Sequence, residues 1–459
     1  MRSGEASTAW LKGRSRTREQ SGGRGAGRRC AACRGTKLAL GTLAGLLLAA
    51  GTAHAGSTFT VNDAGDEPDT DLAGICDTSA DPGNQCTLRA AIQESNFLAG
   101  SNEIAFDIPG GGTATIAPET LLPDITASLA INGYTQPGAQ MNTARLGKPL
   151  DTKIRVFIDG SGVAPDYPSA GLEFTAGAGG SVVEGLAIGS FPGPGVFSSA
   201  PITVRGSFLG TDQRGRDALP NTEGFFGFGG DGSVIGGATA AERNLISANG
   251  FGGVVSNPAV IVRGNYIGTQ RDGTSPLGNG VGQDRGGVLL YANSVSNEVV
   301  NNVIAHNESL GIALQNSGPG SLFRGNRMFG NGGLGIDLYG DGVTPNDNLD
   351  ADSGPNGLQN FPVIAEATRR NGKTKVLVRL DSEPDTSYEI DVYEADGNTR
   401  QGKRLVGGKS LTTDENGSGS RVLKVRKPKK GQRVIATATN PSLGTSGATS
   451  EFSKPRKVK

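Results

Sequence analysis

The stretch Val204-Arg-Gly-Ser-Phe-Leu-Gly-Thr211 returns 58 residues later as Val262-Arg-Gly-Asn-Tyr-Ile-Gly-Thr269. A shorter Asn-to-Asn motif recurs around these copies, as Asn244-Leu-Ile-Ser-Ala-Asn249, Asn302-Val-Ile-Ala-His-Asn307 and Asn326-Arg-Met-Phe-Gly-Asn331. Each shorter copy is followed by an apolar strand segment ten residues after its first Asn. Because a repeating unit buries its apolar face only against its neighbours, such a repeat determines the architecture.

The spacing of the repeat predicts a parallel β-helix over residues 104–345. The turn positions align as Gly185, Ser207, Asn244, Asn265, Asn302 and Asn326, with steps of 22, 37, 21, 37 and 24 residues. A step near 22 residues fits one coil of three short strands at about 3.3 Å per residue, together with their turns. Asn tolerates left-handed backbone, and its amide can bond to the same residue in the next coil. We therefore interpret these Asn residues as a structural ladder.

The two 37-residue steps each carry an insertion that begins directly after Gly-Thr. Insertions at one register project from one side of a solenoid, so we expect them to form a ligand-contacting rim, with two coils, or about 10 Å, between them. The predicted binding residues of this rim are Asp212, Arg214, Arg216, Asp217, Arg271, Asp272, Asp284 and Arg285. The alternative is that both insertions only lengthen tolerant surface turns.

Composition agrees with many short strands joined by turns, since the 459 residues include 74 Gly and only 5% are aromatic. The formal net charge of zero hides an uneven distribution. Residues 360–459 carry 20 basic and 11 acidic side chains, whereas residues 56–359 carry 14 basic and 31 acidic ones. The acidic body argues against nucleic acid as a partner. The basic part is interpreted as a solvated strand face, with contact to an anionic cell surface as the alternative.

The first 55 residues have the features of a secretory signal peptide. A basic segment precedes the apolar run 38–50, and an Ala-x-Ala cleavage site ends at Ala55. The apolar run is too short to span a bilayer as a helix, so we expect no membrane span after cleavage. Cys76 and Cys86 then remain, and in an exported protein they are predicted to form a disulfide; two free thiols are the alternative.

Residues 56–103 are predicted to cap the open first coil of the β-helix. Residues 58–61 alternate as a strand does. Thr87 can cap a short helix in which Leu88, Ala91 and Ile92 lie on one face. A solenoid needs such a lid because its first coil exposes unpaired strand edges and core side chains.

The segment Cys86-Thr-Leu-Arg-Ala-Ala-Ile-Gln-Glu-Ser-Asn96 resembles the N-terminal signature of exported bacterial proteins named for a Cys-Ser-Leu-Arg-Glu-Ala (CSLREA) motif. Ile131-Asn-Gly-Tyr-Thr-Gln-Pro-Gly138 and Asp341-Gly-Val-Thr-Pro-Asn346 are also similar to theirs, so the resemblance covers nearly all of the mature chain. It implies a right-handed parallel β-helix of the pectin-lyase-like type, export, and no established activity. The chain departs from the motif at Thr87 and at Ala90, which cannot do what a Glu would do there.

No catalytic residue is predicted. Many right-handed β-helices cleave polysaccharides, and this chemistry needs paired carboxylates, or Ca²⁺ ligands with a basic residue. The triplets expected of a polygalacturonase-like enzyme are absent from the sequence. His306 stands where Ala248 and Gly330 stand in the parallel repeats, so we interpret it as a solvent-facing strand residue. Asp337 alternates with apolar neighbours and is expected to face outward.

Residues 346–359 form an acidic linker with the oxygen spacing of a calcium loop. The predicted Ca²⁺ ligands are Asp347, Asn348, Asp350 and Asp352. The match is loose, because no bidentate Glu follows, and a capped, solvated linker is the alternative. Beyond it, residues 360–459 contain strands that alternate apolar with polar residues. This pattern predicts an Ig-like or fibronectin-like β-sandwich that covers the last coil.

The sequence therefore predicts an all-β, exported bacterial protein, secreted or held at the cell surface. Its leading functional interpretation is a non-catalytic β-helix that binds extracellular polysaccharide or cell-surface glycans, or mediates adhesion. A polysaccharide lyase or glycoside hydrolase is the second interpretation, and a structural spacer is the third.

Overall fold

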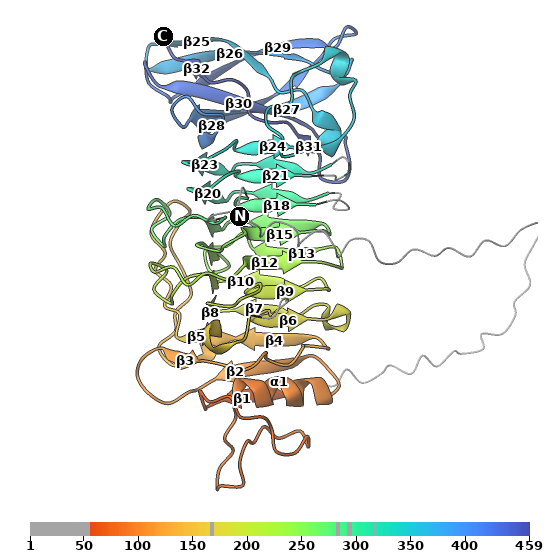
Figure 1. The fold of residues 1–459 in the computed structure, drawn as a ribbon. Helices are drawn as coiled ribbons and strands as arrows, with labels where there is room; N and C mark the ends of the chain where they lie inside the picture. Colours follow the sequence, from red (N-terminus) through yellow and green to blue (C-terminus); the bar gives the residue numbers. More distant parts are fainter. Residues whose placement is uncertain (1–55, 166–168, 281–284, 292–295, 316–317, 319) are drawn as a thin grey trace, which may run out of the picture. The chain divides into compact units, whose positions relative to one another are not determined.

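The computed structural model describes residues 56–459, apart from 166–168, 281–284, 292–295, 316–317 and 319. The predicted signal peptide lies outside the described residues. The described chain is almost entirely β-structure, with long parallel sheets, one α-helix and antiparallel sheets near the C-terminus (Figure 1). The predicted fold class, a parallel β-helix followed by a β-sandwich, is confirmed. Within the described residues, no helix is long and apolar enough to cross a lipid bilayer.

Three parallel sheets form the β-helix, and each full coil contributes one strand to each of them. Sheet A contains, in spatial order, β1 (Thr58–Val61), β2 (Asn102–Phe106), β4 (Leu129–Asn132), β7 (Val182–Glu184), β10 (Thr203–Arg205), β13 (Ser233–Gly236), β16 (Val260–Arg263), β19 (Glu298–Val300) and β22 (Leu322–Arg324). Sheet B contains β3 (Ala114–Ile116), β5 (Val156–Asp159), β8 (Leu186–Gly189), β11 (Phe208–Leu209), β14 (Leu245–Ile246), β17 (Tyr266–Ile267), β20 (Val303–Ala305) and β23 (Arg327–Phe329). Sheet C contains β6 (Leu172–Phe174), β9 (Val196–Ser198), β12 (Glu223–Gly227), β15 (Gly252–Ser256), β18 (Val288–Leu290), β21 (Ile312–Leu314) and β24 (Ile336–Leu338).

The interior of the β-helix is a continuous apolar core. In the coil made by β10, β11 and β12, Val204, Leu209 and Phe225 are fully buried and belong to this core. Val204 pairs with Val183 and Ile235 in the neighbouring strands of sheet A, so similar side chains stack on one another along the axis. Branched apolar residues suit these short strands because they pack well on a pleated surface, and their burial is the main stabilising contribution.

The predicted Asn ladder is present at the turn that enters sheet B. Asn244 Nδ2 donates to Asn265 Oδ1 at 3.0 Å. The next two rungs, Asn265 to Asn302 and Asn302 to Asn326, measure 3.1 and 3.0 Å. All four side chains are buried. One aligned position was wrong by a single residue: Leu186, not Gly185, occupies the equivalent place, because Ala187 pairs with Phe208.

A second buried ladder lies at the turn that leaves sheet B. It joins Asn221, Asn249, Asn279, Asn307 and Asn331 through side-chain amide bonds of 2.9 to 3.2 Å. At the end of this ladder, Asn331 Nδ2 donates at 2.9 Å to Oε1 of Gln401, a residue of the C-terminal domain. A buried amide destabilises the fold unless its donors and acceptors are paired. In a column of stacked Asn residues, the side-chain amide of each coil pairs with that of the next coil.

The helix α1 (Leu88–Phe97) covers the first coil, in agreement with the expected helix face. Thr87 Oγ1 accepts the N–H of Ala90 at 3.1 Å, and Leu88, Ala91 and Ile92 are fully buried in the core. The predicted disulfide between Cys76 and Cys86 is formed, with an S–S distance of 2.00 Å.

The residues that resemble the CSLREA motif therefore have structural roles in this chain. Arg89 forms an ion pair with Asp66 at 2.8 Å and donates to the carbonyl of Leu121 at 2.8 Å, so it ties the helix to two loops. Ala90, where the motif has Glu, is fully buried, and a carboxylate at this position would lose its hydration.

The C-terminal strands form a sandwich of two antiparallel sheets (Figure 1). One sheet contains β25 (Val363–Arg370), β26 (Lys373–Asp381) and β29 (Ser418–Val425). The other contains β28 (Gly402–Thr412), β27 (Ser387–Ala395), β30 (Arg433–Asn440) and β31 (Ala448–Thr449), with β32 (Arg456–Lys457) beside β30. Their inward residues form a separate apolar core.

Side chains of the sandwich complete the last coil. Glu451 Oε1 accepts the N–H of Leu338 in β24 at 3.2 Å, and Thr449 Oγ1 accepts the N–H of Phe323 in β22 at 3.1 Å. Gln401 ends the second ladder in the same way. Since unpaired strand edges favour association with other chains, these contacts protect the end of the solenoid.

Candidate functional site

The two insertions after Gly-Thr are compact loops whose carboxylates bond mainly to their own backbone. Asp212 is buried, and its Oδ1 accepts the N–H groups of Arg216 at 2.8 Å and Asp217 at 3.1 Å. Burial opposes ionisation of Asp212, but these bonds and Arg214 outweigh it and lower the pKa of the carboxyl. Asp272 caps its own loop in the same manner.

The two loops meet directly, although β11 and β17 are two positions apart in sheet B. The N–H of Arg271 donates to the carbonyl of Gly215 at 2.9 Å, so the expected gap between the loops is absent. The intervening coil turns at Ala248 without an insertion, which leaves room for the loops to close over it. The Arg271 guanidinium donates to the carbonyls of Leu150 and Thr152, so this cation holds a neighbouring segment and not a ligand.

That segment, residues 139–155, covers the outer face of sheet B. The outward apolar side chains of the sheet are buried beneath it, and the cluster contains Leu150, Ile154, Phe157, Ala187, Phe208, Leu245, Tyr266, Val303, Ala305 and Phe329. Of the predicted rim, Arg214, Arg216 and Asp217 remain exposed, and Asp284 lies outside the described residues. A ligand-binding role for this rim stays a prediction.

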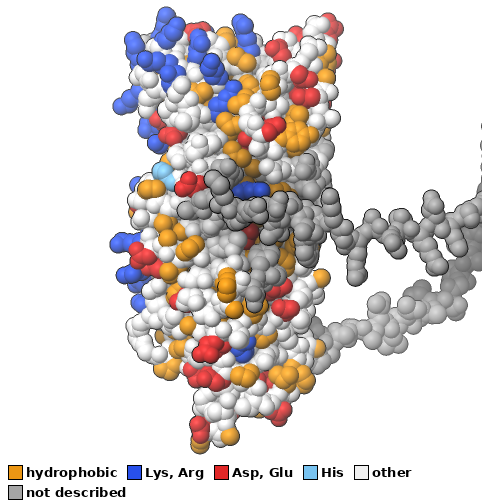
Figure 2. Space-filling model, in the orientation of Figure 1, with side chains coloured by type: hydrophobic (Ala, Val, Ile, Leu, Met, Phe, Trp, Pro, Cys, Tyr) orange, Lys and Arg blue, Asp and Glu red, His pale blue; other side chains and the backbone are white. Residues whose placement is uncertain are grey.

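Sheet C carries an aromatic outer face. Its outward row runs across the seven strands as Glu173, Phe197, Phe226, Val255, Leu289, Ala313 and Asp337. The rings of Phe197 and Phe226 are 5.5 Å apart and edge to face, and those of Phe197 and Phe228 are 6.4 Å apart and stacked. Phe228 is 41% exposed. Figure 2 views this side of the β-helix, where hydrophobic side chains lie among polar ones.

Polar groups adjoin this aromatic row. Arg285, which was predicted for the rim, lies instead with its guanidinium carbon 4.7 Å from the centre of the Phe251 ring and donates to the Tyr291 hydroxyl. Phe251, Tyr291 and Phe226 pack against the same outward cluster on sheet C. Burial raises the pKa of the Tyr291 phenol; Arg285 opposes this rise, and the charge of Glu223 adds to it.

Glu223 is the most unusual carboxyl on this sheet. It begins β12, three residues before Phe226, and only 5% of it is exposed. Its Oε2 has no hydrogen-bond partner among the described residues, and burial raises its pKa to about 7. A buried oxygen without a partner costs free energy, and such groups concentrate at functional sites.

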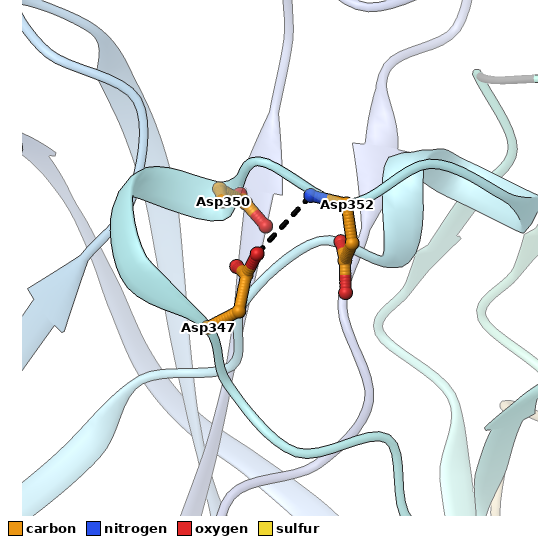
Figure 3. A group of neighbouring side chains, drawn as sticks. All are labelled: Asp347, Asp350 and Asp352. Atoms are coloured by element: carbon orange, nitrogen blue, oxygen red, sulfur yellow. Dashed lines mark hydrogen bonds between the residues drawn. The ribbon is translucent and has the colours of Figure 1, made fainter.

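Three of the four predicted calcium ligands come together in the acidic linker. One carboxylate oxygen from each of Asp347, Asp350 and Asp352 lies within 4.8 Å of the other two (Figure 3). Asp347 Oδ1 and Asp352 Oδ1 are buried without a hydrogen-bond partner. Burial raises the pKa of Asp350 to about 6, and the two neighbouring charges add to the shift. Asn348, the fourth predicted ligand, is exposed.

The prediction for His306 was wrong in one respect. It lies just after β20, in a turn with φ of 60°, and its Nε2 is 2.9 Å from the carbonyl of Thr274. Ala248 and Gly330 occupy the same position in the parallel repeats, and both have φ of 66°. The repeats therefore share a turn at this position, and His306 is not a strand residue. Asp337 faces away from the core as expected, but it is buried and accepts the N–H groups of nearby turn residues.

A groove of about 610 Å³ lies where sheet A meets the sandwich. Arg263 pairs there with Glu298 and Arg324 with Asp391, both at 2.7 Å, and the Arg243 guanidinium donates to the carbonyls of Gly264 and Ala144. The outer face of sheet C is therefore the stronger candidate, because aromatic rings and a carboxyl with an unpartnered oxygen occur together there.

Neither a family model nor a curated protein sequence matches the chain. The resemblance to CSLREA-type proteins stays a prediction, and the functional argument rests on the geometry.

Proposed function

We propose that the protein is an exported bacterial β-helix that binds extracellular or cell-surface carbohydrate without cleaving it. The observation that carries this proposal is the aromatic row of Phe197, Phe226 and Phe228 on sheet C. Aromatic rings offer flat apolar surfaces that match the apolar faces of sugar rings. Phe197 and Phe226 lie on the adjacent strands β9 and β12, about 4.8 Å apart, and Phe228 directly follows β12, so the three rings form one surface on which a sugar chain can lie.

The polar neighbours of the row supply the contacts that orient a sugar. A binding site combines apolar surface with a few fixed polar groups. Glu223 has an unpartnered oxygen, and Arg285 is held by Tyr291 and the ring of Phe251. Hydroxyl groups of a sugar can accept from the Arg285 guanidinium, whereas the Glu223 oxygen is buried beneath the surface.

Binding is favoured over cleavage because glycoside hydrolysis uses two carboxyl groups about 5–10 Å apart. Burial raises the pKa of Glu223 to about 7, and the sequence lacks the triplets expected of a polygalacturonase-like enzyme. Export is supported by the signal-like N-terminal sequence and by the disulfide.

The test compares residues 56–459 with a Phe197→Ala/Phe228→Ala variant on a glycan array and by calorimetry. We expect the double variant to lose at least about tenfold in affinity for the glycans that bind. Phe97→Ala is the matched control, because Phe97 is 55% exposed but belongs to α1. Equal losses in both variants, or no glycan binding by the wild-type chain, would refute the proposal and leave a structural spacer.

A polysaccharide lyase or hydrolase is the second candidate, and the pKa of Glu223 near 7 favours it. A group that titrates near neutral pH can act as a general acid or base. Release of reducing sugars by the wild-type protein, abolished in Glu223→Gln, would establish this function in place of binding alone.

We also propose that Asp347, Asp350 and Asp352 hold a calcium ion. Ca²⁺ prefers carboxylate oxygens, and the two buried oxygens without donors fit a cation better than a neutral linker. The ion would brace the connection between the β-helix and the sandwich.

A further inference from the structure

One sheet of the sandwich presents basic side chains on its outer face. In β26, Lys373, Lys375 and Arg379 are exposed and alternate with buried residues. Lys375 pairs directly with Lys424 of β29, and both point away from the core. Like charges directly opposite each other in a sheet are destabilising, so this arrangement costs stability in the absence of an anion.

Two other segments extend the same face. The N–H of Arg369 in β25 donates to the carbonyl of Lys459 at 2.9 Å, which places the C-terminal residues beside this strand. The Arg369 guanidinium also donates to the carbonyls of Arg426 and Pro428, in the loop that follows β29. The resulting basic surface consists of Arg370, Lys373, Lys375, Arg379, Lys424, Arg426, Lys427, Lys429, Lys430, Arg456, Lys457 and Lys459, all of them exposed.

The charge of this basic surface is at most partly compensated within the described chain. None of its residues belongs to an ion pair of the described structure. Glu366 is a carboxylate close to it; a hydrogen bond from Thr368 and the charges of Lys375 and its neighbours lower the pKa of this exposed group. In Figure 2, Lys and Arg side chains gather over the upper left of the sandwich, Asp and Glu side chains lie at its upper right, and both signs are mixed on the β-helix.

We propose that the basic surface binds an anionic polysaccharide, a sugar polymer that carries carboxylate, phosphate or sulfate groups. Single-stranded nucleic acid fits less well, because no aromatic side chain belongs to this surface to stack against bases. A lipid surface also fits less well, since the described sandwich has no amphipathic helix to insert. The inference goes beyond the carbohydrate site on sheet C: it concerns another domain and a charged ligand.

The experiment measures binding of polygalacturonate to residues 56–459 at two salt concentrations. We expect binding to weaken as salt is raised, because exposed charges are screened. Lys373→Gln/Lys375→Gln/Lys424→Gln/Arg426→Gln should reduce the affinity by at least about tenfold. Its melting temperature should stay the same or rise, because the repulsion between Lys375 and Lys424 is removed. This readout distinguishes lost binding from misfolding.

The matched control removes the same charge elsewhere, with Arg145→Gln/Lys148→Gln/Lys153→Gln/Lys409→Gln, at residues that are equally exposed but outside the basic surface. It should keep the wild-type affinity. Equal losses in both variants, or no loss in the first, would overturn the proposal. So would tighter binding of the wild-type protein to oligo(dT) or to phosphatidylglycerol vesicles than to polygalacturonate, which would assign the surface to nucleic acid or to a membrane.

Discussion

Sheets B and C both turn apolar side chains away from the common core, but the chain treats their outer faces differently. On sheet B, Phe208 and Tyr266 are fully buried beneath residues 139–155 and the insertion loops. Arg271 and the Tyr266 hydroxyl, which donates to the carbonyl of Lys148 at 2.7 Å, hold this cover in place. On sheet C, Val255, Leu289 and Ala313 of the outward row are also buried, but Phe197, Phe226 and Phe228 remain partly exposed.

The difference shows that outward apolar residues of a β-helix have two distinct explanations. Where a segment of the same chain covers them, they form a second core and add stability. Where they stay exposed in a row, they are available to a ligand, since exposed apolar clusters mark interaction sites. The first three of the four predictions below test this distinction.

Truncation of one ring on each face gives the largest expected contrast. Phe208→Ala should lower the free energy of unfolding by about 3–5 kcal/mol, because it leaves a cavity under the cover. Phe228→Ala should lower it by less than about 1 kcal/mol, because the ring is partly in solvent already. Urea denaturation of both variants measures this contrast, and equal losses would show that the two faces are alike.

The buried carboxyl of Glu223 provides a pH test of the outer face of sheet C. Its pKa is raised to about 7 in the folded protein, so folding favours the protonated form. The stability that this provides is complete below the usual pKa near 4.5 and is lost as the pH rises through 7. Between pH 5 and pH 8, the wild type should lose on the order of 1–3 kcal/mol more than Glu223→Gln.

Urea titrations at both pH values measure that difference. Glu451, whose pKa burial also raises to about 7, contributes equally to both proteins and cancels in the comparison. Identical pH dependence of the wild type and the variant would show that Glu223 is hydrated in solution.

Loosening residues 139–155, which cover sheet B, should lower the free energy of unfolding by a smaller amount. Arg271→Ala removes the donors to the carbonyls of Leu150 and Thr152 and should cost about 1–2 kcal/mol. Amide hydrogen exchange should rise within residues 139–155 and not in sheet C. Arg214→Ala, on the neighbouring loop but exposed, should change stability by less than about 0.5 kcal/mol. Unchanged exchange in Arg271→Ala would mean that the apolar contacts alone hold the segment.

The smallest effect is expected at the acidic linker, which belongs to neither face. Millimolar Ca²⁺ should raise the melting temperature by about 3 °C at pH 7.5, as a weak extracellular site would. The rise should disappear below about pH 6, where Asp350 is protonated and competes with the ion. Asp352→Asn should also abolish it, and calorimetry with Mg²⁺ serves as the control. An equal rise in the variant would place the calcium elsewhere.

Features that repeat along the chain could be predicted because their causes are local. An Asn at the same turn in four successive coils points to a ladder, and a helix face of Leu88, Ala91 and Ile92 points to a cap. The second ladder also left a signal, since Asn249, Asn307 and Asn331 close the shorter motif. The other two members of the second ladder, Asn221 and Asn279, follow insertions that differ in sequence. Only the register of the coils in the structure places them in line with the other Asn residues.

The candidate site could not be predicted, because it depends on which residues face outward and on what covers them. Phe225 and Phe226 are adjacent in sequence, yet one fills the core and the other lies on the surface. Arg285 ends the insertion that Arg271 begins, but the chain has reached sheet C by then. The two arginines therefore lie on different faces, although the sequence pattern places both in one rim.

The sequence by itself determined the stacked coils, the helical cap, the disulfide and the sandwich, since periodicity, capping and alternation act over short distances. Only the tertiary structure decided which of two apolar faces is covered. The cover on sheet B comes from residues more than a hundred positions away from Arg271 and Tyr266. Contacts over such separations depend on how many coils lie between the two segments, and no local pattern records that number.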